Sequence, residues 1–277
     1  MRRTAPMLTL TLALGIGAGL IGEQILNAQQ VPDPRVADLV GAGRVRVGIG
    51  LGTSPLAIKD PVTGEVRGPA LDLGRALAKR IGVEFVPVEY PRPGAVMEGV
   101  RTGAWDVAFL AIDPSRAAEA DFSPPYLQYD LTYMVPADSS IRNVADADQP
   151  GVRIATPRGD ASDLRLSRML KRAELIRADT IPATFDLLRA GQADVLAGVR
   201  PGLLERLARM PGYRVLEDRF GVILVAALVP KGQAGRLAYI SEFIEQAKAS
   251  GLVQQAIERA GLRGVVQVAP PGNPSSQ

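Results

Sequence analysis

The 277-residue chain contains no cysteine and no histidine. Without cysteine it can form no disulfide, no thiolate nucleophile and no cysteine-ligated metal site. Without histidine it lacks the usual general base of serine and cysteine hydrolases and the commonest ligand of transition metals. These absences argue against a hydrolase or a zinc enzyme, while carboxylate, lysine or tyrosine chemistry remains possible. Our expectation is a protein that is not an enzyme, with no catalytic residue, no metal and no cofactor.

The chain also lacks an excess of charge of one sign. Its 32 basic and 29 acidic residues leave a formal net charge of +3, and the basic residues are spread along the sequence. A nucleic-acid surface needs a concentrated basic stripe, so we predict no nucleic-acid partner. The hydrophobic content of 47% is sufficient for a packed core.

The N-terminus has the pattern of a secretory signal peptide. Arg2 and Arg3 precede an apolar stretch at residues 7–21, and residues 26–28 end in a small residue at a plausible cleavage point. We expect residues 1–28 to be removed and the mature protein to be periplasmic, where a cysteine-free chain of this size needs no disulfide. An uncleaved membrane anchor is the alternative reading.

Beyond residue 30, short apolar runs alternate with amphipathic stretches. In the first half, the pattern predicts strands at 44–49, 83–88 and 107–112 and helices at 69–81 and 97–102. In the second half, it predicts strands at 152–155, 176–178 and 195–199 and helices at 160–170 and 184–190. This alternation is typical of parallel α/β units.

One short motif recurs in the two halves. Gly103 and Asp106 follow the end of a predicted helix and open a buried strand, and Gly191 and Asp194 do the same. The motif suggests two copies of one α/β unit, although a helix-to-strand turn of this kind is common enough to recur by chance.

The extended stretches 131–135 and 222–229 could connect the two units, and helices at 237–248 and 252–260 would pack back on the first. The expected organisation is a signal peptide at 1–28, a first lobe at 36–130 and 226–268, a second lobe at 131–225, and a flexible tail at 269–277.

Four motifs appear in a characteristic order. They are residues 45–49 with 54–56; residues 68–73; residues 103–106 with 113–116 and 121–126; and residues 152–155 with Gly159 and 188–194. With them, residues 44–262 resemble the bacterial extracellular solute-binding proteins of family 3, the polar amino-acid receptors of ABC importers. The resemblance implies a monomer with two α/β lobes, two crossing hinge strands, and an inter-lobe cleft that closes on a small polar organic ligand. It also implies a membrane permease as partner.

The resemblance assigns the first lobe's site residues. Arg116 matches the arginine that grips the ligand carboxylate in this family. Ala111 replaces a hydroxyl residue five positions earlier, and Asp113 could either orient Arg116 or cap the following turn. Ser54 and Leu56 would line the pocket, with Leu56 where the family often has an aromatic residue. Two tyrosines, Tyr126 and Tyr129, are expected to pack at the hinge.

In the second lobe, Gly159, Asp160 and Ala161 match the start of the helix that faces the ligand. Arg158 is either a ligand contact or a solvated loop charge. The family commonly has an aspartate at Val199, which pairs with the ligand ammonium. Its loss means either that another acid substitutes or that the ligand is not an ordinary α-amino acid. Arg200, if it faces the cleft rather than capping a turn, would favour an organic anion.

The expected function is therefore that of a periplasmic substrate-binding protein for a small carboxylate-bearing solute, either an amino acid or an organic acid. Two alternatives remain open. One is a periplasmic partner or sensor module on the same fold. The other is a dehydratase-like enzyme, for which Asp113 or Glu65 would have to supply the acid.

Overall fold

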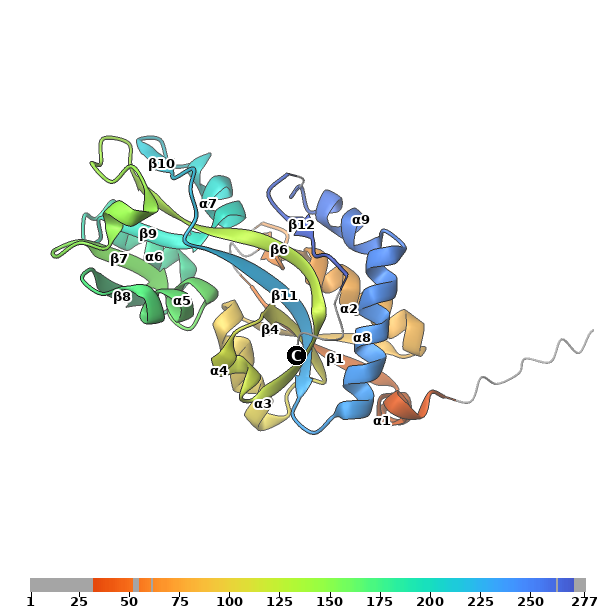
Figure 1. The fold of residues 1–277 in the computed structure, drawn as a ribbon. Coiled ribbons are helices and arrows are strands. Elements are labelled where there is room, and N and C mark those ends of the chain that lie inside the picture. Colours follow the sequence, from red (N-terminus) through yellow and green to blue (C-terminus); the bar gives the residue numbers. More distant parts are fainter. Residues whose placement is uncertain (1–31, 52–54, 61, 263, 272–277) are drawn as a thin grey trace, which may run out of the picture. The chain divides into compact units, whose positions relative to one another are not determined.

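The described chain forms two α/β lobes (Figure 1), and the two lobes have the same strand order. The computed structural model describes residues 32–51, 55–60, 62–262 and 264–271. In the first lobe the parallel strands are β4 (Glu84–Tyr90), β1 (Arg44–Gly50) and β5 (Val107–Ala111), followed by antiparallel β11 (Gly221–Pro230). In the second they are β8 (Glu174–Ala178), β7 (Arg153–Pro157) and β9 (Val195–Val199), followed by antiparallel β6 (Ala120–Pro136). The predicted duplication of one α/β unit is confirmed.

The long strands β6 and β11 join the two lobes. Residues 120–131 of β6 pair with β11, and residues 131–134 pair with β9. Leu131 pairs with both Gly221 and Val199, so one ladder of hydrogen bonds runs from β4 to β8. The molecule thus has two parallel sheets that share a pair of antiparallel crossing strands, as the predicted fold requires.

Helices pack against the sheets of both lobes. Those of the first lobe are α1 (Ala37–Ala42), α2 (Pro69–Ile81), α3 (Glu98–Thr102), α4 (Pro114–Ala117), α8 (Ala234–Ala249) and α9 (Leu252–Arg259). Those of the second are α5 (Ala161–Met169), α6 (Ile181–Arg189) and α7 (Arg200–Leu207). Helix α8 packs on β6 and β11, and α9 packs on α2 and α8, so both C-terminal helices lie against the first lobe.

Short elements complete the fold. They are the 3₁₀ turns η1 (Pro34–Val36), η2 (Pro93–Met97) and η3 (Val144–Ala147), the hairpin of β2 (Ile58–Lys59) and β3 (Val66–Arg67), and the strands β10 (Tyr213–Val215) and β12 (Gln267–Val268) on β6.

The repeated glycine-to-aspartate turn makes the same hydrogen bonds in both lobes. Its glycine has a positive φ in each copy, 62° in the first and 66° in the second. Asp106 accepts from the Arg46 backbone N–H at 2.8 Å and pairs with its guanidinium at 2.7 Å. Asp194 accepts from the Arg153 backbone N–H at 2.9 Å and pairs with its guanidinium at 2.8 Å. The aspartate therefore fastens the start of one parallel strand to its neighbour.

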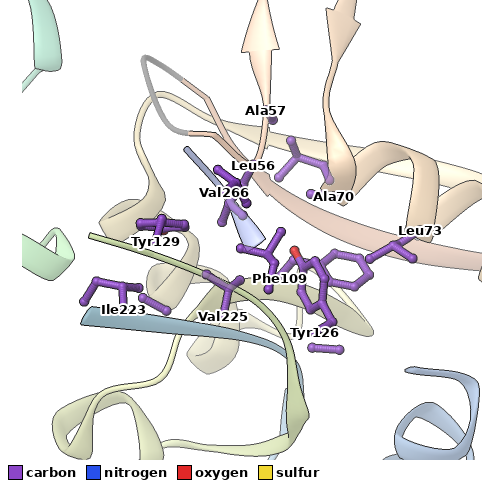
Figure 2. Close-up of a cluster of buried hydrophobic side chains, with 14 of the residues drawn as sticks. Leu56, Ala57, Ala70, Leu73, Phe109, Tyr126, Tyr129, Ile223, Val225 and Val266 are labelled. Atoms are coloured by element: carbon purple, nitrogen blue, oxygen red, sulfur yellow. The ribbon is translucent and has the colours of Figure 1, made fainter. Parts of the chain in front are cut away.

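The hydrophobic core continues from the first lobe to the crossing strands (Figure 2). The rings of Phe109 and Tyr126 meet edge to face, with centroids 5.7 Å apart. Tyr129 and Ile223 are opposite each other in the ladder between β6 and β11. Tyr126 packs inside this core, whereas Tyr129 borders the pocket described below.

Some of the sequence predictions fall outside the residues that the structure describes. They concern the signal peptide at 1–28, Ser54 and residues 272–277 of the tail. Ala269 is buried and donates to the Tyr126 carbonyl at 3.0 Å, so packing continues beyond the predicted lobe boundary at 268. Within the described part of the chain, no helix is long and apolar enough to cross a membrane.

Candidate functional site

A pocket with about 610 Å³ of space free of protein atoms, including its open mouth, lies between the two lobes. Strands β5, β7 and β9 all contribute residues from their carboxyl ends, which is where open α/β sheets bind ligands. The first lobe and the crossing strand β6 supply Leu56, Pro93, Ala111, Arg116 and Tyr129. The second lobe supplies Pro157, Asp160, Ala161, Ser162, Ile181, Thr184, Phe185, Leu196, Ala197, Gly198, Val199, Gly202 and Leu203.

Arg116 is the cation of this pocket. It lies in α4, whose first turn is capped by Asp113, and its residue is only 3% exposed. Its guanidinium donates to the Ala111 carbonyl at 3.0 Å and, across the pocket, to the Gly159 carbonyl at 2.9 Å. Burial lowers the pKa of Arg116, but a guanidinium stays charged at any physiological pH. A fixed positive charge therefore faces the pocket.

Asp160 is the pocket's acid. It is the N-cap residue of α5, but its side chain does not cap that helix. Instead, its Oδ1 accepts from the Gly94 backbone N–H of the first lobe at 3.0 Å. Burial raises the pKa of Asp160 to about 6, although the positive charge of Arg116 and the Gly94 hydrogen bond act in the opposite direction.

Arg116 and Asp160 do not form an ion pair. Among the described residues, no carboxylate lies within 4.0 Å of the Arg116 guanidinium and no cationic nitrogen lies within 4.0 Å of the Asp160 carboxylate. Each nevertheless influences the other's titration through its charge. The pocket thus presents two opposite charges that are not in contact with each other.

Tyr129 adds a third polar group. It packs on the crossing strand β6 opposite Ile223, 5% exposed, and it also lines the pocket. Burial raises the pKa of its phenol, which therefore stays protonated and able to donate a hydrogen bond.

Other contacts between the lobes surround the pocket. Arg92 of the first lobe donates to the carbonyls of Arg158 at 2.6 Å and Asp179 at 3.1 Å. Arg168 of the second lobe pairs with Asp113 at 2.7 Å. These contacts join the two lobes beside the pocket.

Six of the residues proposed from the sequence line the pocket: Leu56, Ala111, Arg116, Asp160, Ala161 and Val199. Gly159 is adjacent and contributes the carbonyl that accepts from Arg116. Ser54 lies outside the described residues.

Three proposed residues are absent from the lining. Asp113 is buried and caps α4 by accepting from the Ser115 backbone N–H at 2.9 Å, which is the capping role considered from the sequence. Arg158 is exposed and pairs with Asp179 at 2.8 Å, so it is a loop charge.

Arg200, the third, turns away from the pocket. Its guanidinium donates to the carbonyls of Leu216, Glu217 and Asp218 and approaches Asp130 at 3.4 Å. Because these acceptors satisfy its charge, Arg200 gives no support to an anion site.

Sequence reasoning missed the apolar wall of the pocket. Ile181 and Phe185 lie on α6, Leu196 lies on β9, and Leu203 lies on α7. The apolar run 195–199 was predicted as a strand. Because open α/β sheets bind ligands at the carboxyl ends of their strands, the last residues of this run could have been identified as pocket residues. Helix α6 begins at Ile181 rather than at the predicted Thr184, so the first of its wall residues was not seen as helical.

The described residues contain no cluster of three or more aspartate or glutamate side chains that could hold a metal ion.

A family model and a known protein both match this chain. A family model described as bacterial extracellular solute-binding proteins, family 3, matches residues 45–261. A glutamine-binding protein of Geobacillus stearothermophilus is 26% identical over 182 residues, which cover 64% of this chain and 69% of that protein.

Two solved structures are similar in fold. The solute receptor for L-cysteine of Neisseria gonorrhoeae has a TM-score of 0.76 at 23% identity, covering 85% of this chain and 99% of that one. An ancestral amino acid-binding protein, AncCDT-1, described as a precursor of cyclohexadienyl dehydratase, has a TM-score of 0.70 at 25% identity, covering 81% and 98%. The predicted two-lobed binding-protein fold is confirmed.

Proposed function

Because the chain belongs to the bacterial extracellular solute-binding proteins of family 3, we propose that it is the periplasmic binding component of an ABC importer. In this proposal the two lobes close on a small carboxylate-bearing solute, which the protein then delivers to a membrane permease. The similar proteins include a glutamine-binding protein and an ABC transporter glutamine-binding protein, which supports a substrate-binding role.

The observation that carries the proposal is the position of Arg116. Its guanidinium is buried in the pocket and uses two of its nitrogens on the carbonyls of Ala111 and Gly159. A guanidinium has five N–H groups, so donors remain for a solute. Carboxylates bind guanidinium groups through short charge-assisted hydrogen bonds, which gain strength in a site shielded from water.

Lobe closure is part of the proposal. Arg116 belongs to the first lobe and Gly159 to the second, so the 2.9 Å hydrogen bond between them depends on the approach of the lobes. A solute held by Arg116 would be in contact with both lobes and would favour the closed arrangement, since a ligand shifts an equilibrium towards the state it binds better.

A thermal-shift screen tests this function. The purified protein is heated with amino acids, dicarboxylates, simple amines and sugars, and a ligand at a hundred times its Kd should add about 2.7 kcal/mol of stability. We expect only carboxylate-bearing compounds to raise the Tm. Arg116→Met should abolish the response, and Arg116→Lys should weaken it because lysine cannot make two parallel hydrogen bonds.

Arg158→Met is the matched control, because Arg158 is an exposed cation outside the pocket. It should respond to ligands as the native protein does. Circular dichroism of Arg116→Met checks that this variant is folded. A native-like response in folded Arg116→Met, or hits confined to amines and sugars, would refute the proposed site.

A dehydratase-like enzyme is the second candidate, and Asp160 is the observation in its favour. A carboxyl with a pKa of about 6 can both donate and accept a proton near neutral pH. The acids first considered for this role are less suitable. Burial acts to raise the pKa of Asp113, but hydrogen bonds from Arg168 and Ser115 outweigh it and hold that pKa below its usual value. Glu65 is exposed and outside the pocket.

Turnover distinguishes the enzyme from the receptor. Hydroxylated cyclic acids are incubated with the protein and followed by NMR for loss of water, with Asp160→Asn as the reference. We expect no product in either sample. Product that depends on Asp160 would replace the receptor proposal with an enzymatic one.

The cellular part of the proposal has its own test. We propose that residues 1–28 direct export and that the mature protein is a periplasmic monomer. Osmotic shock should release the native protein from the periplasm, whereas a variant lacking residues 2–28 should stay in the cytoplasm. Light scattering of the purified protein should give the mass of one chain. Co-purification with a permease supports the importer, whereas co-purification with a periplasmic protein alone would favour a sensor module.

A further inference from the structure

The charges of the pocket are limited to one cation and one anion. Of its described lining residues, only Arg116 and Asp160 are ionisable at neutral pH. The other charged residues nearby are engaged elsewhere, Arg158 with Asp179 and Arg200 with backbone carbonyls. A site with one charge of each sign suits a zwitterion better than a dianion or a simple cation.

Asp160 is placed to receive an ammonium group. Its Oδ1 accepts from Gly94, whereas its Oδ2 accepts no hydrogen bond from the described residues. An ammonium in a closed cleft needs a counter-charge, and Val199 on the same wall cannot supply one. Asp160 is thus the acid able to replace the missing aspartate.

One wall of the pocket is apolar. Ile181, Phe185, Leu196 and Leu203 form a wall of the second lobe, and each is at most 5% exposed. A solute group that extends from Arg116 and Asp160 towards this wall enters a region without charged side chains.

Two hydroxyl groups on this side are already hydrogen-bonded inside the lobe. Thr184 donates to the Thr180 carbonyl at 3.0 Å, and the Ser162 hydroxyl bonds the Thr156 hydroxyl at 2.7 Å. These bonds take up part of the hydrogen-bonding capacity of the two hydroxyl groups. A solute amide or guanidinium would therefore replace only part of its hydrogen bonds to water at this wall, which disfavours polar side chains.

We propose that the solute is an α-amino acid with a hydrophobic side chain, such as leucine, isoleucine, methionine or phenylalanine. Arg116 binds its carboxylate, Asp160 binds its ammonium, and the apolar wall packs against its side chain. This inference rests on the proposed function, and it departs from the polar side chains that the sequence resemblance implies.

Isothermal titration with matched ligands tests the proposal. Leucine is compared with glutamine and arginine, which change the side chain, with 2-hydroxy-4-methylpentanoate, which lacks the ammonium, and with 3-methylbutylamine, which lacks the carboxylate. We expect leucine to bind at least tenfold tighter than each of the other four, since a mismatched polar group or a lost charge partner costs 1.4 kcal/mol or more (about tenfold).

Two variants then test the contacts that the solute side chain and the solute ammonium are proposed to make. Leu203→Asn should weaken leucine binding about tenfold while leaving alanine binding within about twofold. Asp160→Asn should remove the preference for leucine over the hydroxy acid, whereas the exposed surface variant Asp186→Asn should retain it. The comparison of ligands on the native protein tests the specificity even where a variant fails to fold.

The outcomes separate this inference from the proposed function. If glutamine or arginine binds tighter than leucine and depends on Arg116, the hydrophobic specificity is wrong and the receptor function stands. Equal affinity for leucine and its hydroxy acid rejects the role of Asp160. If no carboxylate binds at all, both proposals fail.

Discussion

Arg116 and Asp160 border one pocket from opposite lobes, and no ion pair within 4.0 Å joins them. Backbone groups hold each one in place instead. Arg116 donates to the carbonyls of Ala111 and Gly159, and Asp160 accepts from the Gly94 N–H. Because a direct pair would cancel both charges, this separation leaves both charges available for the solute that we propose.

The raised pKa of Asp160 predicts a pH-dependent stability. The groups that act on this carboxyl are Arg116 and Arg92, which favour its ionised form, and Asp163, which opposes it together with burial. Between its ordinary pKa of 3.8 and about 6, the folded protein holds the proton more tightly than the unfolded chain does. The unfolding free energy contributed by this group is therefore largest below pH 4 and falls as pH rises through 6.

The measurement is urea unfolding of the native protein and of Asp160→Asn without ligand, at pH 4.5 and 7.5. Asparagine removes the charge and can still accept from Gly94. It should stabilise the protein at pH 7.5 by at most about 3 kcal/mol, less where water screens the carboxylate, and by much less at pH 4.5. A difference between the two proteins that is independent of pH would contradict the raised pKa.

Gly94→Ala should weaken ligand binding by about tenfold or more. A Cβ at this position would lie 2.8 Å from the Gly159 carbonyl oxygen of the other lobe and 2.6 Å from the Arg92 guanidinium. The added methyl group therefore opposes the approach of the lobes. Gly41→Ala is the control, because a Cβ there meets nothing within 4 Å. Titration with the best ligand of the screen measures both, and equal affinities would exclude steric control of closure at Gly94.

Asp106→Asn should destabilise the protein more than Asp194→Asn, by about 1–3 kcal/mol against less than about 1 kcal/mol. Both aspartates make the same set of bonds, but the side chain of Asp106 is 12% exposed and that of Asp194 is 40% exposed. Burial acts to raise the pKa of Asp106, yet the hydrogen bonds from Arg46 prevail and keep it below its ordinary value. Urea unfolding at pH 7 compares the two variants, and equal losses would mean that burial does not set the strength of this pair.

The repeated α/β unit could be predicted because it depends on residues close together in sequence, whereas Arg116 was identified through the family resemblance. The turn from Gly103 to Asp106 and its repeat carry their own backbone and capping requirements. The lining of the pocket depends on contacts between distant segments, which composition and periodicity do not report. Arg200 is an example. Its guanidinium donates to the carbonyls of residues 216–218 because β10 and the loop that follows it lie beside Arg200 in the fold.

The position of Asp160 illustrates the same limit. From the sequence it was one of three residues at a helix start, and an aspartate there usually caps its own helix. The structure instead directs its carboxylate to Gly94, a residue 66 positions earlier in the chain. That contact exists only because the lobes meet.

A second-site variant, Val199→Asp combined with Asp160→Asn, should restore the preference for an α-amino acid over its hydroxy acid. Val199 and Asp160 line the same pocket, so an acid at either position can offer its charge to the solute ammonium. We expect Asp160→Asn alone to lose the preference, the double variant to regain at least tenfold of it, and Val199→Asn in the Asp160→Asn background to regain none. Titration with leucine and 2-hydroxy-4-methylpentanoate measures the ratio. If Val199→Asn restores the preference as well as Val199→Asp does, the ammonium is recognised through hydrogen bonding and not through charge, and the electrostatic role given to Asp160 is wrong.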